Sequence, residues 1–379
     1  MRYYIIAGEA SGDLHASNLM KELKILDKHA DFRCWGGDLM KEQGAHLVKH
    51  YRDLAFMGFT EVLMNIRTIL NNIDFCKKDI LANQPDVLIL VDYPGFNLRI
   101  AEFAQSKNIR VFYYISPQVW AWKQSRVQLI KRVVERMFVI LPFEKQFYKD
   151  FDYDVDFVGH PLLDAVASYA EKKEEPAVKA QKPVIALLPG SRKQEIDTML
   201  PLMLKMLNYY PGHQFVIAGA PSQPERIYQL HMDTKQNSAV NEVKIVYNQT
   251  YHLLQQAEAA LVTSGTATLE TALFGVPEVV CYKGGAISFA IAKKLVKVKY
   301  ISLVNLIMDK EIVKELIQDD LTETNLKKEL DKLLNETSRK NMLSDYEELK
   351  LRLGGAGASR KAAELMIFYL RNKPNGYIS

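Results

Sequence analysis

Residues 85–97 read Pro-Asp-Val-Leu-Ile-Leu-Val-Asp-Tyr-Pro-Gly-Phe-Asn, an apolar run that ends at an acidic residue, Asp92. A run that is apolar at every position is typical of a strand buried on both faces, as in a parallel sheet covered by helices. Other β-rich runs alternate with helical stretches, at residues 3–7, 111–115, 137–141, 184–188, 215–218, 259–263 and 278–282. This alternation predicts an α/β protein built on parallel sheets. Ligands of such sheets bind beyond the carboxyl ends of the strands, so the loops there are the candidate sites.

The length of 379 residues suggests about two domains. Residues 167–183 are rich in lysine, glutamate and proline, which is typical of a hydrated linker. We therefore expect two Rossmann-like domains that face a central cleft, an N-terminal one at residues 1–163 and a C-terminal one at residues 183–357. A glycine-rich stretch precedes a last helical pattern, so we expect a closing helix at residues 358–379 that joins the N-terminal domain.

The composition excludes several classes of protein. Lys and Arg exceed Asp and Glu by 49 − 45 = +4, which is too mild for a nucleic-acid binder but suits an anionic ligand or a membrane surface. The three cysteines are far apart and encode neither a disulfide framework nor a zinc site. The apolar runs are shorter than the roughly 20 residues that span a bilayer, and the N-terminus lacks the pattern of a signal peptide. We therefore expect a soluble or peripheral protein of the cytoplasm.

Two loops of the N-terminal domain carry candidate residues. Asp92 directly follows the buried strand, where a partly desolvated carboxylate could act as a general base, or could instead cap the next helix or bind an arginine. The loop after the first strand reads Gly8-Glu9-Ala10-Ser11-Gly12-Asp13 and opens a helix. Its glycines would let a ligand approach the backbone, but a tight turn capped by Ser11 or Asp13 explains the pattern equally well. The ligand-binding alternative would use Gly8, Glu9, Ser11 and Gly12.

Two loops of the C-terminal domain favour a nucleotide diphosphate. The strand at 184–188 leads into Pro189-Gly190-Ser191-Arg192, which combines backbone donors, a hydroxyl and a guanidinium. The strand at 259–263 leads into Ser264-Gly265-Thr266, with Glu270 four residues after Thr266 on the same helix face. We expect the loops to hold phosphate and Glu270 to accept hydrogen bonds from ribose hydroxyls.

Further patterns leave two explanations open. Trp120 and Trp122 lie in a loop, either against a sugar or an acyl chain or as packing residues. Apolar residues with helical spacing begin in an expected loop and are followed by lysines and an arginine, which indicates either core packing or a helix at a membrane surface. The membrane-facing candidates are Phe56, Met57, Phe59, Val62, Leu63 and Ile66. We expect no metal site, because the alternating aspartates at 150, 152, 154 and 156 are also typical of an edge strand.

Taken together, the motifs resemble those of the lipid-A-disaccharide synthases, inverting glycosyltransferases of family 19 with the GT-B fold. The resemblance covers nearly the whole chain, in the same order, at residues 8–13, 57–63, 92–97, 116–122, 141–144, 158–161, 188–192, 264–270 and 300–306. It implies that UDP-2,3-diacylglucosamine donates its sugar to 2,3-diacylglucosamine 1-phosphate (lipid X), which gives a β-1,6-linked disaccharide 1-phosphate and UDP.

The resemblance also implies roles for individual residues. Asp92 matches the family's essential aspartate, and Arg192 and Asn305 match active-site positions. Gly95 departs from the pattern, because some relatives carry a second acid there. In the implied mechanism Asp92 takes the proton of the acceptor's 6-hydroxyl, and Arg192 with the glycine loops stabilises the departing UDP without a metal or cofactor. The family further implies a homodimer that is peripheral on the cytoplasmic face of the bacterial inner membrane.

Three other functions are compatible with parts of this pattern. A UDP-sugar epimerase would convert a UDP-sugar without an acceptor. A non-catalytic nucleotide-sugar-binding protein would tolerate the loss of Asp92. The transferase that adds N-acetylglucosamine to a peptidoglycan lipid differs in its acceptor.

Overall fold

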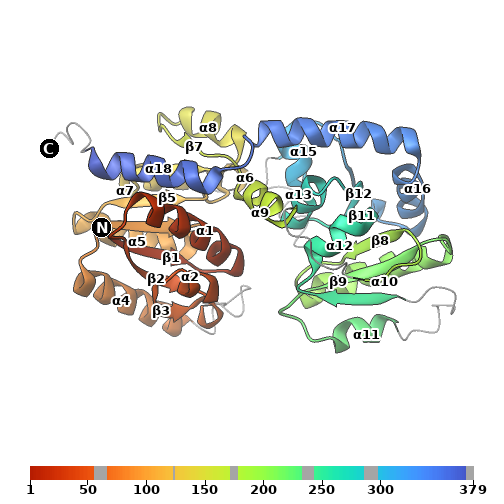
Figure 1. The fold of residues 1–379 in the computed structure, drawn as a ribbon, viewed down its shortest axis with the longest axis horizontal. Helices are drawn as coiled ribbons and strands as arrows, with labels where there is room; N and C mark the ends of the chain where they lie inside the picture. Colours follow the sequence, from red (N-terminus) through yellow and green to blue (C-terminus); the bar gives the residue numbers. More distant parts are fainter. Residues whose placement is uncertain (55–65, 123, 171–177, 233–242, 286–297, 373–379) are drawn as a thin grey trace. The chain divides into compact units, whose positions relative to one another are not determined.

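The structure is a computed structural model that describes residues 1–54, 66–122, 124–170, 178–232, 243–285 and 298–372. The chain forms two compact units (Figure 1). Unit 1 consists of Met1–Asp164 together with Leu353–Ser379, and unit 2 consists of Ala165–Arg352. The N-terminal and C-terminal parts of the chain therefore share one unit. No helix among the described residues is long and apolar enough to cross a membrane.

Unit 1 contains a seven-stranded sheet in its described part, in the order β3-β2-β1-β4-β5-β6-β7 with every pair parallel. The strands are β1 (Arg2–Ala7), β2 (Asp31–Gly36), β3 (His46–His50), β4 (Val87–Val91), β5 (Val111–Tyr114), β6 (Arg136–Val139) and β7 (Asp156–Phe157). The helices are α1 (Ala10–Leu26), α2 (Asp38–Glu42), η1 (Tyr51–Asp53), α4 (Ile66–Asn83), α5 (Pro94–Ser106), α6 (Val119–Trp122), α7 (Arg126–Val133), α8 (Pro142–Lys149) and α18 (Ala358–Arg371). Helix α9 (Pro161–Ala170) begins in unit 1 and ends in unit 2.

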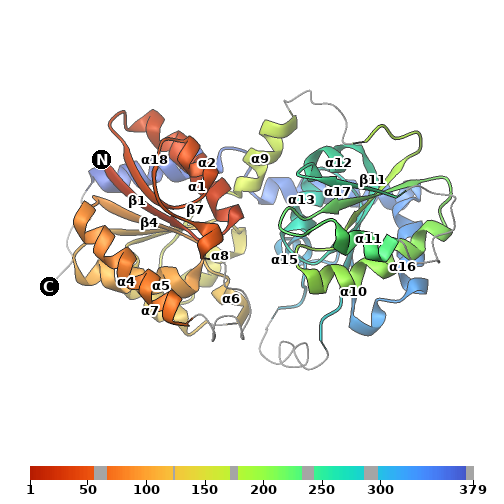
Figure 2. The same cartoon turned by 90° about the horizontal axis from the view of Figure 1, so that it is seen from below.

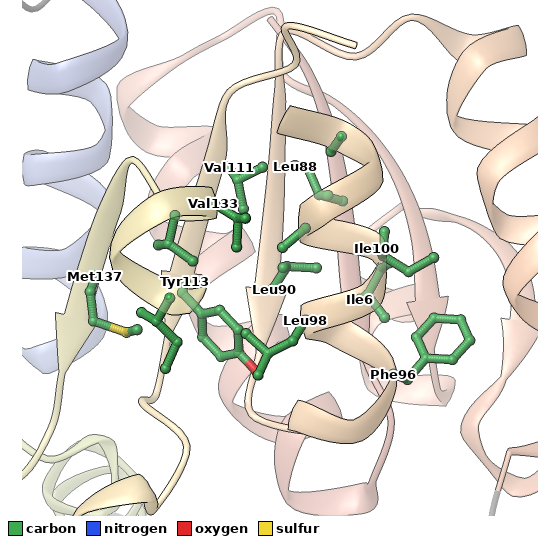
Figure 3. Packing of buried hydrophobic residues seen from close by; sticks show 14 of the residues in the cluster. Ile6, Leu88, Leu90, Phe96, Leu98, Ile100, Val111, Tyr113, Val133 and Met137 are labelled. Atoms are coloured by element: carbon green, nitrogen blue, oxygen red, sulfur yellow. The ribbon is translucent and has the colours of Figure 1, made fainter. Parts of the chain in front are cut away.

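Both faces of this sheet are covered by helices, which is why β4 is apolar at every position. Helices α4, α5 and α7 cover one face, and α1 lies beside α18 on the other (Figure 2). Figure 3 shows Leu88 and Leu90 of β4 and Tyr113 of β5, which pack against α5. The side chains of α5 in this contact include Leu98 and Ile100.

Unit 2 repeats this architecture with a six-stranded parallel sheet in the order β10-β9-β8-β11-β12-β13. The strands are β8 (Val184–Leu188), β9 (Gln214–Gly219), β10 (Lys244–Tyr247), β11 (Ala257–Thr263), β12 (Glu278–Tyr282) and β13 (Lys314–Ile317). The helices are α10 (Lys193–Leu204), η2 (Lys205–Asn208), α11 (Arg226–Met232), α12 (Thr250–Gln256), α13 (Thr266–Leu273), α15 (Leu303–Met308), η3 (Gln318–Asp320), α16 (Glu323–Leu333) and α17 (Glu336–Arg352). Helices α10, α11 and α16 contribute to the core on one face, and α12 contributes to the core on the other.

The predicted fold class, two α/β domains with parallel sheets, is confirmed. The strands that sequence patterns did not indicate are mainly edge strands, β3, β7, β10 and β13, together with β2. These strands are short or carry charged residues, as at Lys49, Asp156 and Lys314, so an apolar run does not mark them.

The strand order places one switch point in each sheet. In unit 1 the order reverses between β1 and β4, and in unit 2 it reverses between β8 and β11. At each switch point, the loops after the two neighbouring strands lead away in opposite directions. Ligands of open α/β sheets bind in the crevice between two such loops. They are the same loops that the sequence singles out.

Candidate functional site

In unit 1, the loops after β1 and β4 are packed against each other. The ring of Tyr93 lies so close to Gly8 that a side chain at Gly8 would come within 2.4 Å of the ring. Both Asp92 and Tyr93 have left-handed backbone conformations, with φ of 43° and 48°. Left-handed conformations are costly for residues other than glycine and cluster at functional sites. The turn after β4 is thus held in one geometry by its neighbour.

The backbone of Asp92 is fixed from the adjacent strand and from its own helix. Its carbonyl accepts hydrogen bonds from the Tyr113 hydroxyl and from Asn97 Nδ2, the latter at 2.7 Å. Burial, and then the nearby charge of Glu9, raises the pKa of Asp92 to about 6, whereas the Tyr93 backbone N–H lowers it. Asp92 is therefore mostly ionised at neutral pH, with a basicity closer to neutrality than that of an ordinary aspartate, as a general base requires.

The rest of the loop after β1 divides into structural and accessible parts. Asp13 is buried and its carboxylate accepts hydrogen bonds from the backbone N–H groups of Gly37 (2.8 Å), Leu39 (3.1 Å) and Met40 (3.1 Å). Asp13 therefore lies in the first turn of α1 but caps a different helix, α2. Glu9 precedes α1, whose N-terminus is capped by no side chain in the described part of the protein, and Ser11 is exposed.

Gly12 has a packing role in this loop. A Cβ atom on Gly12 would lie 3.2 Å from Ala7 Cβ, so the glycine lets α1 start close to β1.

The motif around Trp120 forms a buried hydrogen-bonded cluster. Trp120 packs edge-on against Phe143 at a centroid distance of 5.0 Å. The Glu144 carboxylate accepts hydrogen bonds from the N–H groups of Ile140 (3.2 Å) and Leu141 (2.9 Å). Burial raises the pKa of Glu144 to about 7. Packing therefore explains Trp120, whereas the side chain of Trp122 lies outside the described residues.

In unit 2, an internal acid occupies the backbone donors of the loop after β8. Glu195 Oε2 accepts hydrogen bonds from the N–H groups of Ser191 (3.0 Å) and Arg192 (3.2 Å). Gly190 has φ of +107°, and a Cβ there would lie 2.6 Å from that same oxygen. The predicted phosphate donors of this loop are thus engaged. The Arg192 side chain remains 68% exposed, with its Nη1 atom 3.5 Å from Glu195 Oε1.

In contrast to the β8 loop, the loop after β11 ends at the exposed N-terminus of a helix, α13. Among the described residues no side chain caps the N-terminus of α13, and Gly265 and Thr266 are exposed there. A helix N-terminus without a cap presents unpaired N–H groups that suit an anion. Ser264 is anchored by its hydroxyl, which donates to the Ile301 carbonyl at 3.2 Å. Glu270 lies one turn further along α13 and accepts a hydrogen bond from the Tyr251 hydroxyl at 3.0 Å.

The side chain of Asn305 is buried and saturated with internal hydrogen bonds. Its Oδ1 accepts from the N–H groups of Ile312 (2.8 Å) and Val313 (3.0 Å). Its Nδ2 donates to the Val313 carbonyl and to Glu315 Oε1, both at 2.9 Å. Glu315 also binds both the N–H and the hydroxyl of Ser302, the residue that caps α15. Asn305 therefore fixes the start of α15 and has no free polar atom for a ligand in this conformation.

The predicted membrane-facing residues fall largely outside the described structure. Phe56, Met57, Phe59, Val62 and Leu63 are not described, and Ile66 is described only as the first residue of α4. The next turns of α4 nevertheless expose large apolar side chains at Leu70, Phe75 and Leu81, with Arg67 and Lys78 also exposed.

Sequence reasoning did not identify Tyr93, Glu195, Tyr251 or Glu315. Only Glu195 had a local signal, because a glutamate three residues after a helix N-cap is typical of a capping box. Among the described residues no group of three or more His, Cys, Asp and Glu side chains could hold a metal ion.

Comparisons with known proteins identify the family of the chain. A family model described as lipid-A-disaccharide synthetase matches residues 3–367. Similar curated proteins include the lipid-A-disaccharide synthases of Geobacter metallireducens (36% identical, covering 98% of each chain) and Psychromonas ingrahamii (38% identical, covering 98% of this chain and 99% of the relative).

Solved structures of the same fold have diverged much further in sequence. A UDP-GlcNAc 2-epimerase from Neisseria meningitidis bound to UDP-GlcNAc aligns with a TM-score of 0.68 at 13% identity, over 97% of this chain and 100% of that one. The glycotransferase of kitacinnamycin aligns with a TM-score of 0.65 at 14% identity, over 97% of this chain and 98% of that one. These likenesses establish the GT-B type of fold, two Rossmann-like units in one chain.

Proposed function

Because the chain belongs to the lipid-A-disaccharide synthase family, it is a glycosyltransferase of lipid A biosynthesis, and we propose its substrates and the roles of its residues. The donor is UDP-2,3-diacylglucosamine and the acceptor is 2,3-diacylglucosamine 1-phosphate. The products are the β-1,6-linked disaccharide 1-phosphate and UDP.

The observation that carries the proposal is the geometry of Asp92. Its backbone is held in the left-handed region by hydrogen bonds from Tyr113 and Asn97, and burial raises the pKa of its carboxyl to about 6. A positioned carboxylate of this basicity is suited to accept the proton of the acceptor's 6-hydroxyl while that oxygen attacks the anomeric carbon. The bond from the anomeric carbon to UDP breaks on the opposite face, so a single displacement inverts the centre.

The donor site is assigned to unit 2. The uncapped N-terminus of α13 at Ser264, Gly265 and Thr266 supports binding of the diphosphate, because unpaired N–H groups and the helix dipole favour an anion. The exposed guanidinium of Arg192 supports stabilisation of the negative charge that develops on the departing UDP. Gly190 and Ser191 shape this loop around Glu195. Asn305 acts as a positioning residue through α15 and Glu315.

The N-terminal loop residues Gly8, Glu9, Ser11 and Gly12 are assigned to the acceptor side. Gly8 allows close packing against Tyr93, the residue after Asp92, Gly12 lets α1 start close to β1, and Glu9 contributes to the pKa of Asp92. The proposed base lies in unit 1 and the proposed donor loops lie in unit 2, so a catalytic cycle requires both units. Association with the cytoplasmic face of the inner membrane and a homodimeric state remain predictions from the family resemblance.

The test is a two-substrate assay in detergent with Asp92→Asn beside the wild type, followed by mass spectrometry. We expect the wild type to form the disaccharide 1-phosphate and the variant to lose about 10²–10⁴ in rate while its affinity for UDP is retained. Asp31→Asn is the matched control, because Asp31 is an exposed aspartate on β2.

Each alternative gives a different result. Nearly full activity in Asp92→Asn would remove Asp92 from the mechanism. Conversion of the UDP-sugar in the absence of acceptor would identify an epimerase. A folded protein that binds UDP but forms no disaccharide would overturn the proposed acceptor.

A further inference from the structure

Tyr251 connects two helices next to the proposed donor site. It lies on α12, which follows β10, and its hydroxyl donates a hydrogen bond to Glu270 Oε1 on α13 at 3.0 Å. Among the described side chains, only Tyr251 donates a hydrogen bond to the Glu270 carboxylate. The bond therefore links α12, which packs over β8, β9 and β10, to the helix at the switch point.

The ring of Tyr251 is itself held in place. It packs against Phe274, just after α13, with ring centroids 5.0 Å apart, and against the edge of Tyr169 at 5.3 Å. Burial and the Glu270 carboxylate raise the pKa of Tyr251 far above its usual value, so the hydroxyl stays protonated and acts as a donor. A rigid ring with a neutral hydroxyl fixes the orientation of the carboxylate that it binds.

Glu270 has the chemistry to bind a sugar hydroxyl. Burial raises the pKa of its carboxyl, and the Tyr251 hydrogen bond acts in the opposite direction. With Oε1 engaged by Tyr251, Oε2 is left to accept hydrogen bonds from a ligand, since an ionised carboxylate has about four lone-pair positions. Glu270 shares its helix face with Thr266 at the uncapped N-terminus of α13. A diphosphate at that terminus would leave the ribose about one helical turn away, near Glu270.

We propose that Tyr251 is a positioning residue that makes unit 2 selective for a ribonucleoside diphosphate, by holding Glu270 with one carboxylate oxygen directed to the ribose hydroxyls. This inference rests on the proposed function, because it requires that UDP binds at α13. It assigns Tyr251 no part in the chemical step. A site built to accept a hydrogen bond from a hydroxyl rejects an analogue that lacks it, because the buried carboxylate is then left without a partner.

The experiment compares affinities for UDP, 2′-deoxy-UDP and 3′-deoxy-UDP by isothermal titration calorimetry. We expect the wild type to bind UDP roughly tenfold or more tightly than at least one deoxy analogue. Tyr251→Phe should weaken UDP binding roughly five- to tenfold, leave the affinity for that analogue nearly unchanged, and so bring the ratio close to one. A purely structural role of Tyr251 would weaken all three ligands together.

Tyr247→Phe is the matched control. Tyr247 lies on β10, and its buried hydroxyl has no hydrogen-bond partner in the described part of the chain, so its removal should leave the ratio as in the wild type. Glu270→Gln is the second variant and keeps the test decisive if Tyr251→Phe does not fold. It preserves the shape of the side chain and should also bring the ratio close to one.

The outcomes separate this inference from the function on which it rests. No binding of UDP to the folded wild type would contradict the proposed function itself. Binding of UDP without discrimination against either deoxy analogue would overturn the inference and leave the proposed function standing. Discrimination that persists in Tyr251→Phe would show that Tyr251 does not set it.

Discussion

The basicity of Asp92, the proposed base, depends on a neighbouring residue. Burial makes the larger contribution to its raised pKa, and the charge of Glu9 makes the next. Glu9 comes from the loop after β1 and Asp92 from the end of β4, so two neighbouring strands set one protonation equilibrium. The sequence shows both acids but not their proximity, which follows from the strand order.

This arrangement predicts the pH dependence of the transfer. Asp92 must be ionised to accept a proton, so kcat/KM should fall as the pH decreases through about 6, the pKa of Asp92. Glu9→Gln removes a negative charge that raises this pKa, so the acidic limb of the profile should move to lower pH. The measurement is kcat/KM against pH for both proteins.

Glu102→Gln is the control for that profile. Glu102 lies on α5 and is paired with Arg132 at the surface. Its replacement by glutamine changes the net charge by the same amount as Glu9→Gln, but it removes no group that contributes to the pKa of Asp92. An acidic limb that stays in place in Glu9→Gln, or that moves as far in the control, would contradict the prediction.

At the scale of elements, the first glycine motif serves two helices. At its start Gly8 packs against Tyr93 and the charge of Glu9 acts on Asp92, whereas its last residue, Asp13, binds three backbone N–H groups at the start of α2. A side chain at Gly37 would lie 2.5 Å from Asp13 Oδ2, so the glycine there lets the carboxylate approach the helix. The motif therefore combines a part that borders the proposed base and a structural part within six residues.

Removal of this cap should destabilise unit 1. Asp13→Ala leaves the N–H groups of Gly37, Leu39 and Met40 without their partner in a buried region, at a cost of about 1–3 kcal/mol in the free energy of unfolding. Urea denaturation followed by circular dichroism measures this loss. Asp31→Ala, at an exposed position of β2, should change the free energy by less than about 0.5 kcal/mol. Equal stability of Asp13→Ala and the wild type would show that α2 does not need the cap.

The elements differ in how far the sequence could predict them. The central strands β1, β4, β8 and β11 are marked by apolar runs, and the loops at the two switch points carry the motifs, so the positions of both candidate loops could be predicted. The role of Asn305 could not, because its four hydrogen bonds reach residues 312–315 and form only when β13 is in place. Glu195 illustrates the same limit, since a loop that suits phosphate by composition is already closed by its own helix.

At the scale of the whole molecule, the net charge of +4 is small, so the distribution of the charges matters more than their sum. Helix α4 exposes Leu70, Phe75 and Leu81 together with Lys78 along its solvent side. Apolar and basic side chains on one helix are typical of a surface that contacts anionic lipid. The proposed lipid substrates would require such a contact, because acyl chains partition into a membrane.

We therefore expect the protein to bind vesicles that contain phosphatidylglycerol and to be released as the salt concentration rises, since salt screens exposed charges. Lys78→Glu should weaken vesicle binding roughly tenfold, because each basic residue near an anionic surface contributes about 1 kcal/mol and the substitution also adds a repulsive charge. Lys328→Glu changes the net charge equally at an exposed position of α16 in unit 2 and serves as the control. Co-sedimentation with the vesicles measures both. If the two variants lose the same affinity, the net charge and not α4 governs the association, whereas a loss confined to Lys78→Glu places the membrane contact on this helix.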